Sequence, residues 1–200
     1  GSLAGDAMTD TDSTVLIGYG AGSAINSADS NGTIAIGYQA GVNITEAVGS
    51  TLIGYQAGYT VVTNDYNTMI GYQAGMDADS SGGANATQNV YLGAFAGKDM
   101  DDGANNVAVG YGSLKGNSSG ANDAADCIAI GTNALYNITD GPRNVGLGVS
   151  ALQSLTTGTE NMAMGKSALL SLTTGGQNVA IGQSAMSSAD GAESYNIAIG

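Results

Sequence analysis

The chain has 200 residues and a formal net charge of −13, with only four Lys and Arg residues and no His. This balance excludes nucleic acid as a partner and disfavours an anionic membrane surface, because both need clustered basic side chains. No apolar run approaches the ~20 residues of a membrane-spanning helix, so we expect no membrane insertion.

Residues 1–13 precede the first repeat, and we interpret them as a tag remnant (Gly1-Ser2) followed by a lead-in. From residue 14 onward, an aliphatic residue followed by glycine recurs eleven times, at intervals of about 17 residues. A fixed period of this size is typical of repeat proteins, in which each unit buries its apolar face against its neighbours. The expected anchor glycines are Gly18, Gly37, Gly54, Gly71, Gly93, Gly110, Gly131, Gly148, Gly165, Gly182 and Gly200.

The three residues before each anchor glycine predict a short β-strand. The outer two are mostly large and apolar and the middle one is mostly small, as in Val179-Ala180-Ile181. Alternate residues share one face of a strand, so the two larger side chains point one way and the small one points the other. β-branched residues dominate and helix-capping patterns are absent, which favours strand over helix.

A polar residue stands four positions before every anchor glycine. It is asparagine in seven copies, and Thr14, Thr33, Ser50 and Cys127 in the other four. Stacked side-chain amides can hydrogen-bond along a column, so we expect an asparagine ladder. Its members are Asn67, Asn89, Asn106, Asn144, Asn161, Asn178 and Asn196.

Two types of repeat follow one another along the chain. Residues 14–97 carry glycine four positions after the anchor and mostly tyrosine directly after it, whereas residues 98–200 carry leucine or methionine at the fourth position. Side chains of different size must pack around that position in the two halves, so we expect the cross-section of the coil to change between Gly97 and Leu114. The chain stops directly after an aliphatic-glycine step, and we expect one continuous solenoid that is truncated at its C-terminus.

These patterns together predict an all-β fold, a repetitive parallel β-roll or β-solenoid with coils of about 17 residues. Each coil offers only two or three apolar side chains to an interior, which is a small core for a stable chain. We therefore expect a homotrimeric fibre, in which three copies share one core.

The segment from Asn178 to Met186, with Leu172-Thr173-Thr174-Gly175 before it, resembles the repeats of phage and viral tail-fibre proteins. Its Val-Ala-Ile-Gly step is also similar to the head repeats of trimeric autotransporter adhesins, which form a trimeric left-handed parallel β-roll. The resemblance covers residues 14–200. The adhesin heads use shorter coils, which favours the tail-fibre interpretation.

The resemblance implies a structural, receptor-contacting shaft segment of an extracellular virion tail fibre, whose partners are its own copies and a cell-surface glycan or protein receptor. The alternative is the head of a trimeric adhesin on a bacterial surface. A calcium-stabilised ice- or glycan-binding solenoid is a further alternative; paired threonines recur in only two coils, which disfavours ice binding.

We expect no enzymatic activity and no required cofactor. The chain has no histidine, and its one cysteine lies in the polar column, so the usual nucleophile–base pairs cannot be built. Hexapeptide-repeat acyltransferases also have aliphatic-glycine steps, but their six-residue recurrence and catalytic histidine are missing here.

Two kinds of ligand site remain candidates. The run Asp77-Ala78-Asp79-Ser80-Ser81-Gly82 matches the start of a calcium loop, and Asp99 and Asp101 form a second acidic group; solvated acidic loops are the alternative. Gln88 stands where an EF-hand has its bidentate acid, which excludes a complete EF-hand. Tyrosines in or near loops could stack on sugar rings, with ordinary packing as the alternative. These are Tyr59, Tyr66, Tyr136 and Tyr195.

Overall fold

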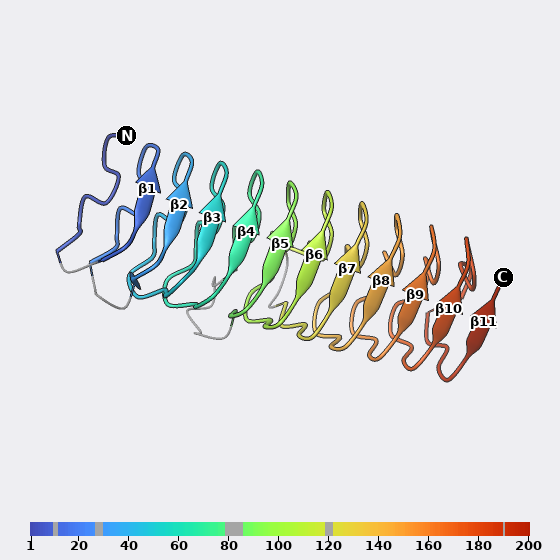
Figure 1. Ribbon diagram of the computed structural model, residues 1–200. Coiled ribbons are helices and arrows are strands. Elements are labelled where there is room, and N and C mark those ends of the chain that lie inside the picture. The colour runs from blue at the N-terminus through green and yellow to red at the C-terminus, as the bar shows by residue number, and fades with distance from the viewer. Residues whose placement is uncertain (10–11, 27–29, 79–85, 119–121, 190) are drawn as a thin grey trace.

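The computed structural model describes residues 1–9, 12–26, 30–78, 86–118, 122–189 and 191–200. It is an all-β parallel solenoid in which eleven three-residue strands form one sheet in sequence order, which confirms the expected fold class and coil length. Figure 1 shows the strands side by side in a row, with the two termini at opposite ends of an elongated molecule. The strands are β1 (Val15–Ile17), β2 (Ile34–Ile36), β3 (Thr51–Ile53), β4 (Thr68–Ile70), β5 (Val90–Leu92), β6 (Val107–Val109), β7 (Ile128–Ile130), β8 (Val145–Leu147), β9 (Met162–Met164), β10 (Val179–Ile181) and β11 (Ile197–Ile199).

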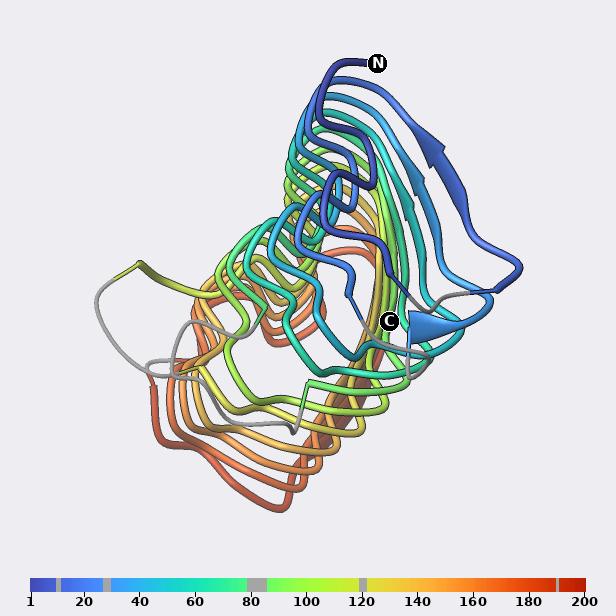
Figure 2. The ribbon, with the colours of Figure 1, turned by 90° about the vertical axis from the view of Figure 1, so that its left-hand side faces the viewer.

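Equivalent residues of successive coils lie directly beside each other. Gly146 of β8 pairs with Ala163 of β9, which pairs with Ala180 of β10, and every other described strand pair keeps the same register. Viewed from the end, the coils lie behind one another around a common interior (Figure 2). At ~4.8 Å per strand, the sheet extends on the order of 50 Å.

The anchor glycines set this close stacking. Their φ angles lie between 128° and 147°, a region that side chains rarely adopt. A Cβ on Gly148 would lie 2.7 Å from the carbonyl carbon and oxygen of Gly165 in the next coil. Any larger residue would therefore push two coils apart, which explains why the sequence repeats glycine at this point.

The middle residue of each strand faces the interior, whatever its size, and the two residues beside it face outward. Ala129 in β7 is fully buried, whereas Ile128 and Ile130 on either side of it are 38% and 42% exposed. The same alternation holds in the other strands, with small differences at the first and last. The sheet therefore presents an outward surface of mostly aliphatic side chains, with threonine at Thr51 and Thr68, which we call the aliphatic face.

The interior is filled from different walls in the two halves. In the first half, Leu52, Met69 and Tyr91 project from the strands, and the glycine four positions after each anchor leaves room for them. A Cβ on Gly75 would collide with Met69, and one on Gly97 with the ring of Tyr91. In the second half, the strand residue shrinks to alanine or glycine, and a buried leucine at the fourth position supplies the missing volume.

The change in repeat type is thus a compensating exchange of size within one continuous sheet, since β5 and β6 on either side of it are paired. The exchange has a backbone cost. Leu114, Leu135, Leu152 and Leu169 all have left-handed φ angles between 48° and 53°, a conformation that costs a non-glycine residue about 1–3 kcal/mol. Complete burial of these side chains offsets that cost.

Seven positions after the anchor, a further column of apolar residues completes the core. The column was not recognised in the sequence, because insertions begin close to it and its residue types vary. Its fully buried members are Ile25, Ile44, Val61, Ala78, Met100, Ile138, Leu155 and Leu172.

Candidate functional site

The asparagines form a buried ladder, but most of its bonds join a side chain to the backbone. The Asn161 side-chain oxygen accepts the Asn178 backbone N–H at 3.0 Å, and the Asn161 amide donates to the Gly175 carbonyl at 2.8 Å. Direct amide-to-amide bonds occur at the C-terminal end, where Asn178 Nδ2 donates to Asn161 Oδ1 at 2.9 Å. The ladder therefore ties each strand both to the next strand and to the adjacent loop.

Cys127 takes one place in this ladder. Its Sγ accepts the Asn144 backbone N–H at 3.5 Å, where the asparagines of other coils use an oxygen at about 2.9 Å. Burial raises the pKa of the thiol to about 11. The residue is fully buried and acts as a weak substitute for asparagine, with none of the thiolate character of a nucleophile.

Aromatic rings stack along the first half of the solenoid, directly after the anchor glycines. The rings of Tyr38 and Tyr55 lie 5.2 Å apart and nearly parallel, and those of Tyr55 and Tyr72 lie 5.1 Å apart. Ala94 interrupts this column, and Phe95 beside it inserts its ring at 5.3 Å from Tyr72 and 5.6 Å from Tyr111, close to perpendicular to both. Ladders of rings and of aligned glutamines stabilise the outer edge, with Gln73 donating to Gln56 at 3.0 Å.

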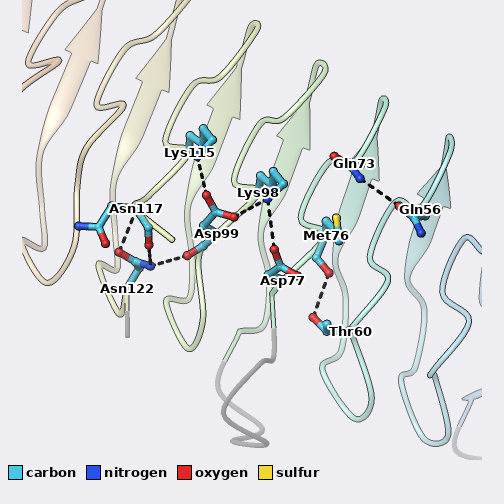
Figure 3. A network of polar contacts seen from close by, with 10 residues as sticks. All are labelled: Gln56, Thr60, Gln73, Met76, Asp77, Lys98, Asp99, Lys115, Asn117 and Asn122. Atoms are coloured by element: carbon cyan, nitrogen blue, oxygen red, sulfur yellow. Dashed lines mark hydrogen bonds and ion pairs between the residues drawn. The ribbon is translucent and has the colours of Figure 1, made fainter. Parts of the chain in front are cut away.

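Figure 3 shows how the acidic residues near the middle of the chain are bound. Asp99 is 4% exposed and accepts from the ammonium groups of both Lys98 and Lys115, and Lys98 also reaches Asp77 at 3.4 Å. Burial works to raise the pKa of Asp99, but the two lysines outweigh it and hold the pKa below its usual value. At Asp77 burial outweighs the attraction of Lys98, and the pKa is raised.

The calcium candidates therefore divide into three groups. Asp77 and Asp99 lie in one network, where lysines occupy the carboxylate oxygens that a cation would need. Asp101 is buried and has partners of its own. Asp79 and Ser81 lie outside the described residues. In the part of the chain that the structure describes, no group of three or more acidic, histidine or cysteine side chains could hold a metal ion.

The four candidate sugar-binding tyrosines lie on different coils and do not form one site. Tyr66 and Tyr195 are exposed and each lies next to the ladder position, before β4 and β11 respectively. Tyr59 and Tyr136 are half-buried on the segments that return from the turns after β3 and β7. Of the four, Tyr136 lines a pocket.

That pocket has a volume of about 240 Å³ and lies where the repeat type changes. Three aromatic residues, Phe95, Tyr111 and Tyr136, line it together with Lys98 and Lys115. The Lys115 nitrogen lies 5.3 Å from the centre of the Tyr136 ring, within the range of a cation–π contact. Gly112 completes the lining; we call this the aromatic–lysine pocket.

Five of these six lining residues were not predicted as site residues from the sequence. A usable pattern was present, because Lys98 and Lys115 are half of the basic residues in the chain and both lie five positions after an anchor glycine. Gly112 was also visible as a glycine where neighbouring repeats carry Phe95 and Asn133. Only the coil geometry shows that these positions surround one hollow.

In the described residues, no helix is long and apolar enough to cross a membrane. No family model matches this sequence, and neither a curated protein nor a solved structure matches it.

Proposed function

We propose that this chain is a structural, receptor-contacting shaft segment of a trimeric viral tail fibre, exposed to the outside of the cell. The observation that carries the proposal is the aliphatic face, which extends along the eleven described strands with Thr51 and Thr68 as its polar members. The resemblance of residues 14–200 to tail-fibre repeats supplies the biological setting.

The aliphatic face is too apolar and too continuous for a chain that works alone. Its two columns are mostly Val, Ile, Leu and Met, and their exposure is about two-fifths of each side chain in several strands. With a length on the order of 50 Å and a width of two side chains, its footprint is on the order of 500 Å². Contiguous apolar patches of that size generally mark interaction surfaces.

Three copies can remove this face from water together. If their sheets run parallel around one axis, the aliphatic faces of all three meet in a shared core. The regular register favours such an arrangement, since each coil presents the same columns in the same order. The loops on the far side of each coil stay exposed and are free to contact a receptor.

Sedimentation equilibrium at micromolar concentration tests the assembly, and we expect the mass of three chains. Ile130→Lys places a charge in the middle of the aliphatic face and should shift the protein toward monomers. Leu170→Lys is the matched control, because its column already carries Lys98 and Lys115 and the change should leave the trimer intact. A monomeric or dimeric wild-type chain would refute the trimer.

The setting has a separate test in the sequence that flanks this segment in its parent protein. A virion-attachment domain or a C-terminal intramolecular chaperone supports the tail fibre. A membrane-anchoring barrel downstream would instead identify the head of a bacterial surface adhesin.

A further inference from the structure

We propose that the aromatic–lysine pocket binds a carboxylated pyranose, a uronic acid or sialic acid residue of a cell-surface glycan. This rests on the receptor-contacting part of the proposed function and is independent of the trimer. It names the class of ligand and the residues that hold it.

The pocket exists because one coil lacks a side chain. Gly112 is buried and has a φ of 60°, the same left-handed conformation as Phe95 and Asn133 at the equivalent positions of the adjacent coils. A Cβ there would lie 2.8 Å from Asn133 Oδ1 and 3.2 Å from the Tyr136 ring. Gly112 is therefore a local break in the repeat, where Asn133 and Tyr136 of the next coil approach the backbone closely, at the point where the two repeat types meet.

Two fixed positive charges stand in the wall of this hollow. The chain has a net charge of −13, and Lys98 and Lys115 are two of its four basic residues. Asp99 holds both ammonium groups in place from below the surface, with the Lys98 nitrogen at 2.7 Å from Asp99 Oδ1. An ammonium group has three N–H donors, so after the described bonds to Asp99 and Asp77 each lysine keeps at least one for a ligand.

A polar atom without a hydrogen-bond partner in the described part of the chain also lies close to the pocket, next to its lining residue Gly112. Asn133 Oδ1 is buried and has no hydrogen-bond partner among the described residues, and it lies beside Gly112. Buried acceptors are normally satisfied by protein or by a bound molecule.

The chemistry of these groups fits an acidic sugar. The rings of Phe95, Tyr111 and Tyr136 offer apolar faces to the C–H side of a pyranose, and the two lysines offer charge-assisted hydrogen bonds to a carboxylate. At about 240 Å³ the pocket is smaller than the ~300–1,000 Å³ sites of drug-sized ligands, so one sugar ring fits and a nucleotide does not.

Binding of free sugars to the purified chain can be measured by saturation-transfer NMR titration, with glucuronic acid, N-acetylneuraminic acid and glucose as probes. Glucose and glucuronic acid share the same ring and differ at the carboxylate. We expect at least one acid to bind with a dissociation constant on the order of 1 mM, as ordinary ligand efficiency gives for so small a molecule. Glucose should bind at least about tenfold more weakly, a difference typical of one charge-assisted contact. Whichever acid binds more tightly shows whether the natural ligand is a uronic acid or a sialic acid residue.

Gly112→Asn fills the pocket without changing charge, and asparagine tolerates the left-handed conformation. We expect it to weaken acid binding at least about tenfold, a loss of the size that truncated contacts give. Gly20→Asn is the matched control, because Gly20 is the equivalent position of the first coil, with a φ of 65° and free space for a Cβ. Phe95→Gln, which copies Gln73, provides a second pocket variant should Gly112→Asn unfold.

Lys115→Gln should lower acid binding toward the level of glucose, and Lys166→Gln, an exposed lysine on another coil, should not change it. The proposal is overturned if neither acid binds, if glucose binds as tightly as glucuronic acid, or if a folded pocket variant binds the acid as the wild type does. Light scattering on the same samples reports the assembly separately, so the trimer and the pocket can fail independently.

Discussion

The exchange of size between the two halves of the core makes a quantitative prediction for Met69 and Gly75. In this coil the methionine side chain occupies the space beside the glycine, whereas the coils of the second half carry alanine and leucine at these two positions. The double variant Met69→Ala/Gly75→Leu converts the coil to the second type. We expect it to be far more stable than either single variant.

The magnitudes follow from the packing. Met69→Ala empties a fully buried site and should cost about 2–5 kcal/mol. Gly75→Leu forces a side chain into occupied space at a φ of 55° and should cost about 1–3 kcal/mol for overpacking plus about 1 kcal/mol for the backbone. In the double variant only the backbone cost should remain, so the interaction energy should be about −3 kcal/mol or larger in size.

Urea unfolding followed by circular dichroism measures this cycle. Because long repeat arrays can lose cooperativity, each variant should be compared by several probes before free energies are taken. A matched control pairs Met69→Ala in the coil of β4 with Leu152→Ala in the coil of β8, and the effects of these two variants should simply add. If the effects of Met69→Ala and Gly75→Leu also add, the two positions do not share one volume and the explanation of the repeat change is wrong.

Three further predictions concern the ladder, the anchor and the buried ion pair. Cys127→Asn should raise the free energy of unfolding by about 1 kcal/mol, because an amide oxygen replaces sulfur as the acceptor for the Asn144 backbone N–H, whereas Cys127→Ala should not stabilise the protein. The wild-type thiol should react with Ellman's reagent only after unfolding. Gly148→Ala should destabilise the protein by more than about 3 kcal/mol, because Gly148 has a φ of 137° and contacts the next coil closely. Gly146→Ala, two residues earlier, should be tolerated, and equal melting temperatures for the two variants would contradict this explanation. The lowered pKa of Asp99 means that its contribution to stability is present above its unfolded value of 3.8 and is lost as the pH falls through the lower folded value. Asp99→Asn should therefore be less stable than wild type at pH 7, and the difference should shrink in unfolding experiments below about pH 3.8; a difference that does not change with pH would count against the ion pair.

The repeat itself was readable from the sequence because it depends on local chemistry. The aliphatic-glycine step specifies a strand end at a backbone conformation that favours glycine, and eleven copies in register leave a parallel solenoid as the consistent fold. The asparagine column was visible for the same reason: one residue type at one position in seven coils points to a bond that every coil needs. The position of the change between Gly97 and Leu114 was also readable, since it is a change of residue type within a column.

The tertiary structure decided which way each column faces. Alternation along a strand separates two faces but does not say which is inside, and here the middle residue of each strand points inward and its two neighbours point outward. Side-chain volume across the coil also explains what the Gly-to-Leu change does, because Tyr91 and Gly97 compensate each other over a space that no linear pattern displays. The aromatic–lysine pocket depends on the same information, since Phe95, Gly112 and Tyr136 belong to three successive coils that only stacking brings together. Sequence sets the period and the bonds along each column, and packing between columns sets the interior, the outward face and the pocket.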